Sequence, residues 1–181
     1  MRAIALMTKY PRIGEVKSRL KLSPFLSLKL YQAFLRDLES LLIKSKPYLH
    51  ADLFCFFSIE EDEIPQDFKF CEEIEIKKQR GKGLGEKISN VLEDLEAQGY
   101  QEVIIIGGDT LNLRLEDFEI SFLTLESEPS AVILGPTLDG GIYLLAHNTN
   151  NETEYLKKID WGTDKVFSQL ETNINQTGQL L

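Results

Sequence analysis

Hydrophobic positions along the chain fall into two patterns, short continuous apolar runs and longer stretches with apolar side chains three or four residues apart. The runs predict buried strands at residues 3–7, 51–58, 102–108, 130–136 and 140–147, and an alternating run predicts an edge strand at 73–79. The wider spacing predicts helices over residues 24–45, 84–99, 114–126 and 163–171. Strands that alternate with helices are typical of an α/β sandwich on a mainly parallel sheet, with the wholly apolar run 102–107 at its centre.

Prolines and acidic residues mark the connections between these elements. Pro24 suits the first turn of the first helix, and Pro47 is expected just beyond its end, because proline lacks the N–H that a helix interior uses. The acidic stretch 59–67 is most simply a solvated connection. Because the chain shows no internal repeat and no linker, residues 1–181 are expected to form one domain.

The charge balance limits the class of partner. With 20 Lys and Arg against 29 Asp and Glu, the formal net charge is −9, which argues against a nucleic acid or an anionic membrane as partner. A small phosphorylated ligand held in one basic pocket is compatible with this charge. Two cysteines, Cys55 and Cys71, are too few for a disulfide framework, and no apolar run reaches the roughly 18 residues of a membrane helix. The N-terminus does not resemble a signal peptide, so a soluble cytoplasmic protein is expected.

Ligands of open parallel sheets bind beyond the carboxyl ends of the strands, which selects three segments: residues 8–20, 107–113 and 135–141. The first reads TKYPRIGEVKSRL and is basic in an acidic chain. If it is extended, Lys17 and Arg19 share one face and form a clamp for phosphate oxygens, with Val16, Ser18 and Leu20 turned inward. The alternative is a solvated basic loop. No Walker pattern is present, which argues against a P-loop nucleotidase.

The other segments each have a functional and a structural interpretation. Asp109 follows the most apolar strand and can either bind Mg²⁺ beside substrate phosphates or cap the following turn. Asp139-Gly140-Gly141 is typical of a hairpin turn, although its glycines also let a ligand approach the backbone. The motif GKGLGEK opens a helix whose free N–H groups can hold an anion, but it lacks the spacing of a dinucleotide site.

The histidines and the tryptophan carry less information. His50 and His147 are isolated in the sequence and suggest neither a metal pair nor a catalytic triad. Trp161 is more often a packing residue than a ligand contact in such a position. None of these three residues is therefore assigned to a site.

Five motifs taken together resemble a known family. In chain order they are TKYPRIGEVKSRL, GKGLGEK, GGDTLNL, GPTLDGGIYLL and WGTDKVF. Their order and spacing are similar to those of a bacterial glycosyltransferase-like family, the radical-SAM/selenodomain-associated transferases, which is related to 2-phospholactate guanylyltransferases. The resemblance runs from the first strand to about residue 170. It implies the nucleotide-diphospho-sugar transferase fold (GT-A type), a Rossmann-like three-layer α/β/α sandwich.

The resemblance also implies a set of site residues. Lys17 and Arg19 would face the phosphates of a nucleotide, Asp109 would be the metal-binding aspartate for Mg²⁺ or Mn²⁺, and Asp139 would lie on the acceptor or sugar side. Of these, the predicted catalytic residues are Lys17, Arg19 and Asp139. The predicted nucleotide- or phosphate-binding set is Thr8, Lys9, Gly14, Lys17, Arg19, Gly83, Gly85, Gly140 and Gly141. The implied activity is Mg-dependent nucleotidyl or glycosyl transfer from a nucleoside triphosphate or a nucleotide sugar to a small phosphorylated or hydroxyl acceptor.

Two departures from the family pattern bear on activity. The family usually reads Gly-x-Asp-x-Pro-x-Leu at the metal aspartate, and here Leu111 stands at the proline position. The family also tends to continue into an Asp-rich segment, whereas this sequence stops at QTGQLL. A catalytically silent relative that binds a nucleotide or a phosphosugar is therefore the alternative to a transferase.

Overall fold

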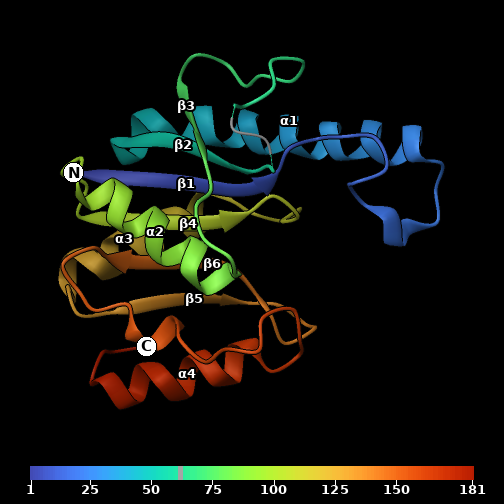
Figure 1. Ribbon diagram of the computed structural model, residues 1–181. Helices are drawn as coiled ribbons and strands as arrows, with labels where there is room; N and C mark the ends of the chain where they lie inside the picture. The colour runs from blue at the N-terminus through green and yellow to red at the C-terminus, as the bar shows by residue number, and fades with distance from the viewer. Residues whose placement is uncertain (61–62) are drawn as a thin grey trace.

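A six-stranded sheet with helices on both faces organises the computed structural model, which describes residues 1–60 and 63–181 (Figure 1). The strands are β1 (Arg2–Lys9), β2 (Ala51–Ser58), β3 (Ile74–Lys78), β4 (Glu102–Gly107), β5 (Val132–Pro136) and β6 (Ile142–Asn148). The helices are α1 (Pro24–Leu49), α2 (Leu84–Glu96), α3 (Leu115–Ser127) and α4 (Val166–Thr177), with 3₁₀ turns η1 (Ser18–Leu20) and η2 (Glu154–Leu156). The predicted α/β sandwich is confirmed.

The strand order across the sheet is β3-β2-β1-β4-β6-β5. β1 pairs in parallel with β2 and with β4, and β2 pairs in parallel with β3, whereas β6 runs antiparallel to both β4 and β5. The chain first moves outward from β1 to β3 and then returns to the other side of β1 with β4. The carboxyl ends of β1 and β4 therefore flank a topological switch point, the place where open α/β sheets bind ligands.

Two apolar layers hold the helices on the faces of the sheet. Along β1, Ile4 and Leu6 pack with α1 and α3, while Ala3 and Ala5 pack with α2 and α4 on the opposite face. Residues 103–106 of β4 are at most 5% exposed, because β4 lies between β1 and β6 and is covered on both faces. The central position predicted for this run is confirmed.

Two helix ends differ from the expectation. α1 passes through Pro47 and ends at Leu49, which is 5% exposed and packs in the core, so its burial holds the last turn despite the missing N–H. α4 continues to Thr177 because Ile174, in its second half, is fully buried. In both cases the burial of an apolar side chain extends a helix beyond the limit that the local sequence suggests.

The connections agree with the remaining expectations where the structure describes them. Asp139 and Gly140 lie in the turn of the β5–β6 hairpin, as predicted. Of the acidic segment 59–67, residues 61 and 62 lie outside the described residues. Cys55 is a buried free thiol, as expected, and burial raises its pKa. Among the described residues, no helix combines the length and the apolar character needed to cross a membrane.

Candidate functional site

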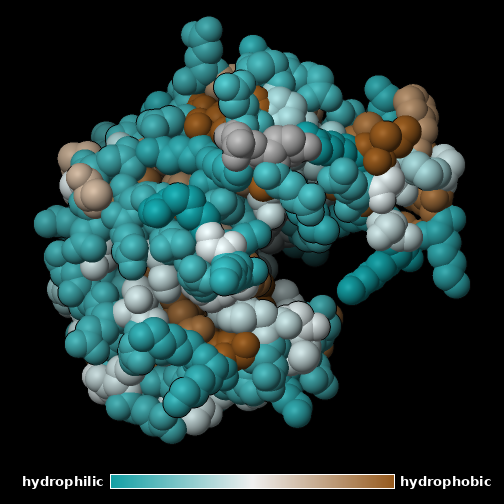
Figure 2. All heavy atoms as spheres, viewed as in Figure 1, coloured by the Kyte–Doolittle hydropathy of each residue, from teal (hydrophilic) through white to brown (hydrophobic). Residues whose placement is uncertain are grey.

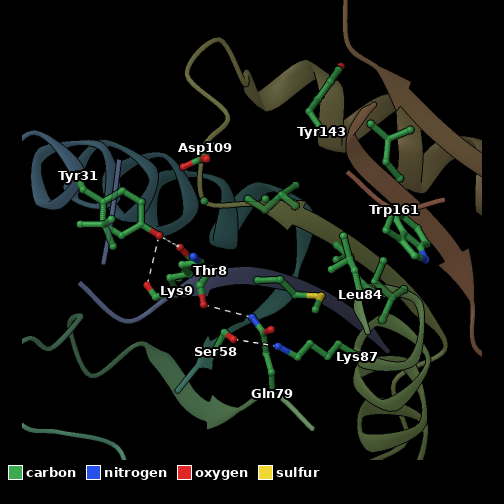
Figure 3. A pocket seen from close by; sticks show the side chains of 18 of the residues that line it. Thr8, Lys9, Tyr31, Ser58, Gln79, Leu84, Lys87, Asp109, Tyr143 and Trp161 are labelled. Atoms are coloured by element: carbon green, nitrogen blue, oxygen red, sulfur yellow. Dashed lines mark hydrogen bonds between the residues drawn. The ribbon is translucent and has the colours of Figure 1, made fainter. Parts of the chain in front are cut away.

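An open cleft of about 810 Å³ lies beyond the carboxyl ends of β1 and β4, at the switch point (Figure 3). The segment between β1 and α1 projects from the body of the molecule and forms one wall, and Figure 2 shows the hollow beside it. The opposite wall comes from residues 82–88, which include the first turn of α2. The ends of β1, β2 and β4, the residue after β3, and the start of β6 line the floor. The cleft is thus built where the fold predicts a ligand.

Positive charge gathers in this cleft although the chain as a whole is acidic. Its lining contains five cations and two carboxylates: Lys9, Lys17, Arg19, Lys82 and Lys87 against Glu15 and Asp109. Within the described part of the chain, the side chains of Lys9, Arg19 and Lys82 have no hydrogen bond or ion pair. Unpaired like charges repel one another, so their gathering favours an anionic ligand between them.

The basic loop after β1 differs in conformation from the prediction. Lys17 adopts a left-handed conformation (φ 52°) and Ser18–Leu20 form η1, so the segment is not extended. Val16 is 2% exposed and anchors the loop in the core, but Ser18 and Leu20 are exposed, and the prediction that they turn inward is wrong. The left-handed residue breaks the strand-like alternation on which that prediction depended. Lys17 and Arg19 nevertheless both line the cleft.

The predicted phosphate-binding lysine and the predicted metal-binding aspartate contact each other. Lys17 Nζ lies 2.9 Å from Asp109 Oδ1, and this ion pair bridges the loops after β1 and β4. The Lys17 side chain is only 17% exposed and lies over the Phe34 ring at 5.1 Å, whereas the Asp109 side chain is 74% exposed. The lysine is therefore held in place, and the aspartate presents a free edge to the cleft.

The carboxylate of Asp109 determines which kind of metal site fits. Among residues 1–60 and 63–181, no cluster of three or more His, Cys, Asp or Glu side chains is arranged to hold a metal. Mg²⁺ binds to proteins through one or two carboxylates and completes its shell with waters and substrate phosphates. The donor set fits an ion that Asp109 shares with bound phosphates, and it does not fit an ion held by the protein alone.

A hydroxyl pair fixes the end of β1 under the cleft (Figure 3). The hydroxyls of Thr8 and Tyr31 lie 2.5 Å apart, and Tyr31 donates to the Lys9 carbonyl at 3.2 Å. Burial raises the pKa of Tyr31 to about 12, with a smaller contribution from the charge of Asp109, so this hydroxyl stays protonated. A Cβ on Gly108 would overlap the Thr8 side chain, so glycine is needed there for the β1 and β4 ends to approach. Thr8 thus shapes the floor of the cleft.

The glycine-rich segment forms the wall that α2 begins. Gly83 is the N-cap of α2 and makes no side-chain cap, so the first N–H groups of the helix are left for other partners. The loop before it is closed by a hydrogen bond from the Lys82 amide to Glu86 (2.9 Å). Lys87 donates to the Ser58 hydroxyl at 2.9 Å and thereby lies across the floor from the basic loop. Of the two glycines predicted here, Gly83 lines the cleft and Gly85 does not.

The hairpin motif lies outside the cleft lining. Asp139 accepts hydrogen bonds from the Thr137 hydroxyl (2.5 Å) and the Gly141 amide (3.4 Å), and these bonds, the first above all, lower its pKa. Gly140 has φ +82°, and a Cβ there would overlap the backbone of Asp164, so this glycine seats the hairpin against the start of α4. Gly14 in the basic loop is also absent from the lining. The cleft lining contains six of the predicted site residues: Thr8, Lys9, Lys17, Arg19, Gly83 and Asp109. Five lie outside it: Gly14, Gly85, Asp139, Gly140 and Gly141.

Several lining residues are not part of the sequence-based site. They are Tyr31, Ser58, Gln79, Lys82, Lys87, Tyr143 and Trp161. Ser58 and Gln79 stand at the ends of predicted strands, so the rule about carboxyl strand ends could have selected them. Tyr31 comes from a helix and Trp161 from a loop near the C-terminus, and no local pattern marks either as facing the cleft.

Three solved structures share the fold of this chain. A protein from Desulfovibrio desulfuricans G20, described provisionally as a nucleotide-diphospho-sugar transferase, aligns with a TM-score of 0.85 and 24% identity over 100% of this chain and 79% of its own. A 4-diphosphocytidyl-2C-methyl-D-erythritol synthase aligns at 0.55 with 12% identity (99% and 87% covered). A CMP:2-keto-3-deoxy-manno-octonic acid synthetase complexed with CTP aligns at 0.52 with 10% identity (99% and 87% covered). The predicted nucleotide-diphospho-sugar transferase fold is confirmed.

Sequence comparison adds one assignment. No curated protein matches the chain. Residues 46–163, which run from the end of α1 through β6 to the loop before α4, match a bacterial family model. The chain therefore belongs to the family described as uncharacterized protein conserved in bacteria (DUF2064).

Proposed function

We propose that this protein is a metal-dependent transferase that binds a nucleoside triphosphate or a nucleotide sugar in the cleft between β1 and β4. The observation that carries the proposal is the set of cations Lys9, Arg19 and Lys82, whose side chains have no ion pair among the described residues, at the switch point of an acidic chain. The structural neighbours support it, since one is described as a nucleotide-diphospho-sugar transferase and another was solved with CTP. The resemblance of the motifs to radical-SAM-associated transferases and 2-phospholactate guanylyltransferases agrees with the same class of reaction.

The cations act on the charge of the departing diphosphate. In nucleotidyl transfer, an acceptor oxygen bonds to the α-phosphorus while the bond to the leaving diphosphate breaks. In glycosyl transfer, the acceptor bonds to the sugar carbon and the nucleoside diphosphate leaves. In both reactions negative charge develops on a departing diphosphate, which is pyrophosphate in the first and the nucleoside diphosphate in the second, and Lys17 and Arg19 neutralise it. Mg²⁺ or Mn²⁺ held by Asp109 and the phosphates supplies further neutralisation of that charge when bound.

Lys17 has to serve two partners in this proposal. Its ammonium lies 2.9 Å from Asp109 Oδ1 and neutralises that carboxylate. A phosphate that takes over Lys17 leaves the Asp109 carboxylate unpaired and ready for a cation, so nucleotide and metal are expected to bind cooperatively. Asp139 belongs to the acceptor side of the proposal, because it lies in the β5–β6 hairpin, outside the lining in which the cations gather.

Calorimetry with and without metal tests the proposal. ADP, GDP, CDP and UDP are titrated into the protein, each in the presence and absence of Mg²⁺. We expect at least one to bind, and Mg²⁺ to raise its affinity by about tenfold or more, equivalent to about 1.4 kcal/mol. Asp109→Asn keeps the shape of the side chain and removes its charge, so it should abolish this gain while the protein stays folded. An equal affinity with and without metal would contradict the metal-dependent mechanism.

The silent binder is a separate outcome of the same experiments. It is favoured by the one-carboxylate donor set and by Leu111, which is 61% exposed where the family usually has proline. Incubation with nucleoside triphosphates or nucleotide sugars and a set of phosphorylated acceptors, followed by chromatography, distinguishes the two. Release of pyrophosphate or of nucleoside diphosphate that Asp109→Asn abolishes supports the transferase. Tight binding without any release supports the silent relative.

A further inference from the structure

One side of the cleft is apolar, and phosphate binding leaves it unexplained. Trp161, Tyr143 and Ile142 are partly exposed there, and Leu84 is 43% exposed. Figure 3 shows Trp161 and Leu84 across the cleft from Thr8, Tyr31 and Asp109. Exposed apolar side chains that line a concave surface are typical of a ligand subsite.

The indole of Trp161 is held in a fixed position. A Cβ on Gly85 would lie 2.8 Å from both Trp161 Nε1 and the Leu156 carbonyl oxygen, so the indole edge packs directly on the first turn of α2. Glycine inside a helix costs about 1 kcal/mol relative to alanine, and this close approach offsets that cost. The indole also packs against the apolar layer below α2 and α4. Trp161 is partly exposed and lines the cleft, so its Nε1 edge rests against Gly85 while the residue still contributes surface to the cleft.

The strand order places this apolar side beside the phosphates. Asp109 follows β4, and Ile142 and Tyr143 begin β6, which is the next strand in the sheet. Neighbouring strands are about 5 Å apart, so the apolar side is within reach of a group attached directly to a diphosphate. The uncharged polar residues Ser58 and Gln79 lie on the other side of β1, at the ends of β2 and β3.

The geometry points to an aromatic subsite, formed by Trp161 with Leu84 and Tyr143, that receives the sugar ring of a nucleotide sugar. A pyranose has an apolar C–H face, which the indole covers, and a rim of hydroxyls, which the open cleft leaves to water. A nucleobase is read through hydrogen bonds at its edge, and of Trp161, Leu84 and Tyr143 only the indole N–H and the phenol hydroxyl are polar. The inference rests on the proposed function and deepens it, because it names a sugar as the group attached to the diphosphate.

The intrinsic fluorescence of the protein tests the inference, since Trp161 is the only tryptophan in the chain. UDP and UDP-glucose, GDP and GDP-mannose, and ADP and ADP-glucose are titrated pairwise with selective excitation of tryptophan, while calorimetry measures the affinity. We expect the nucleotide sugar of at least one pair to change the Trp161 emission at saturation, and its nucleoside diphosphate to bind without this change.

Two variants and one control complete the test. Trp161→Leu should weaken binding of the nucleotide sugar by roughly 3- to 10-fold, the range of one aromatic contact, and leave nucleoside diphosphate binding unchanged. Gly85→Ala, which displaces the indole without removing it, should have the same selective effect. Tyr48→Leu, at a 75% exposed aromatic residue on α1 outside the cleft, should change neither affinity.

The outcomes separate the two proposals. If nucleoside diphosphates bind but no nucleotide sugar perturbs Trp161, or if Trp161→Leu weakens both members of a pair equally, the sugar subsite is overturned and the proposed function stands. If neither nucleotides nor nucleotide sugars bind, the proposed function is overturned and the subsite falls with it.

Discussion

The polar groups at the two ends of the parallel strands, here called the amino edge and the carboxyl edge of the sheet, differ in whether they have partners. At the amino edge of the parallel strands, Arg2 pairs with Glu102 at 2.7 Å and with Glu126 at 3.0 Å, and its guanidinium lies over the Phe122 ring. At the carboxyl edge, Lys9, Arg19 and Lys82 are left without partners in the described chain. One edge satisfies its own charges and the other exposes them, although both terminate the same strands.

The amino edge also holds a buried histidine. His147 is fully buried near the end of β6; Tyr155 donates to its Nδ1 at 3.0 Å, and its Nε2 lies 3.3 Å from the Asn151 carbonyl oxygen. Burial lowers the pKa of His147 to about 4, so the ring stays neutral at neutral pH. His147 is therefore a structural residue: its ring is buried and held by contacts within the fold, and it is not available to a ligand. The comparison teaches that unpaired charge, rather than charge as such, distinguishes the candidate site.

The largest expected effect is a loss of folding stability at low pH, caused by protonation of His147 at the amino edge. The unfolded chain binds a proton at His147 below pH 6.5, while the folded chain resists protonation down to about pH 4. The free energy of unfolding that the neutral ring contributes is fully present above pH 6.5 and is lost as the pH falls. The loss amounts to about 3 kcal/mol at pH 4. Urea unfolding at several pH values measures it.

His147→Gln provides the control for this titration. The variant is expected to be less stable at neutral pH but to lose less further stability between pH 6.5 and 4 than the parent. An identical pH dependence in the variant and the parent would show that other groups cause the acid lability.

The next largest effect is a loss of nucleotide affinity when a cation is removed from the carboxyl edge. Arg19→Ala should weaken nucleotide binding by about 1.5–3 kcal/mol, the range for hydrogen bonds to charged groups, because it removes an unpaired guanidinium from the cleft. The unfolding free energy should barely change, since Arg19 is exposed and its side chain makes no hydrogen bond or ion pair with the residues that the structure describes. Arg2→Ala is the mirror-image control, which should lower stability and leave nucleotide affinity intact. Unchanged affinity in Arg19→Ala would favour the alternative interpretation, in which the basic loop is solvated and binds no phosphate.

Gly108→Ala tests how closely β1 and β4 must approach at the switch point. The new Cβ would overlap the Thr8 side chain in a closely packed region, so we expect a destabilisation of about 1–3 kcal/mol. Thr8→Ala together with Gly108→Ala removes the overlapping Thr8 hydroxyl oxygen and should recover part of the loss. Thermal and urea unfolding measure both variants, and full stability in Gly108→Ala would show that the two loops can separate without cost.

The smallest effect concerns a single hydrogen bond at the amino edge. Tyr100 donates to Asp52 at 2.8 Å, and Tyr100→Phe should lower the unfolding free energy by about 1 kcal/mol. Because Tyr100 is remote from the cleft lining, nucleotide affinity should be identical to that of the parent. A loss of affinity in this variant would indicate that the two edges are coupled.

Much of the fold follows from local patterns. The apolar run at residues 103–106 predicts a central strand because no polar face is present, and the hairpin at Asp139-Gly140 follows from turn chemistry that Gly140 satisfies with φ +82°. Local patterns fail at Pro47 and in the basic loop. Burial of Leu49 decides the first case and the left-handed Lys17 decides the second, and neither is visible in the spacing of apolar residues.

The sequence by itself determined the class of fold and the three segments at the carboxyl edge, because the periods of strands and helices, and hence the positions where strands end, depend only on neighbours along the chain. The tertiary structure alone decided the partners across that edge. The Lys17–Asp109 ion pair and the seat of Trp161 on Gly85 join segments far apart in the sequence, and the order in which strands enter the sheet brings them together. The tertiary structure also decided which predicted residues line the cleft. Gly140, for example, packs against the backbone of Asp164 and lies outside the lining, and only the folded chain shows that contact.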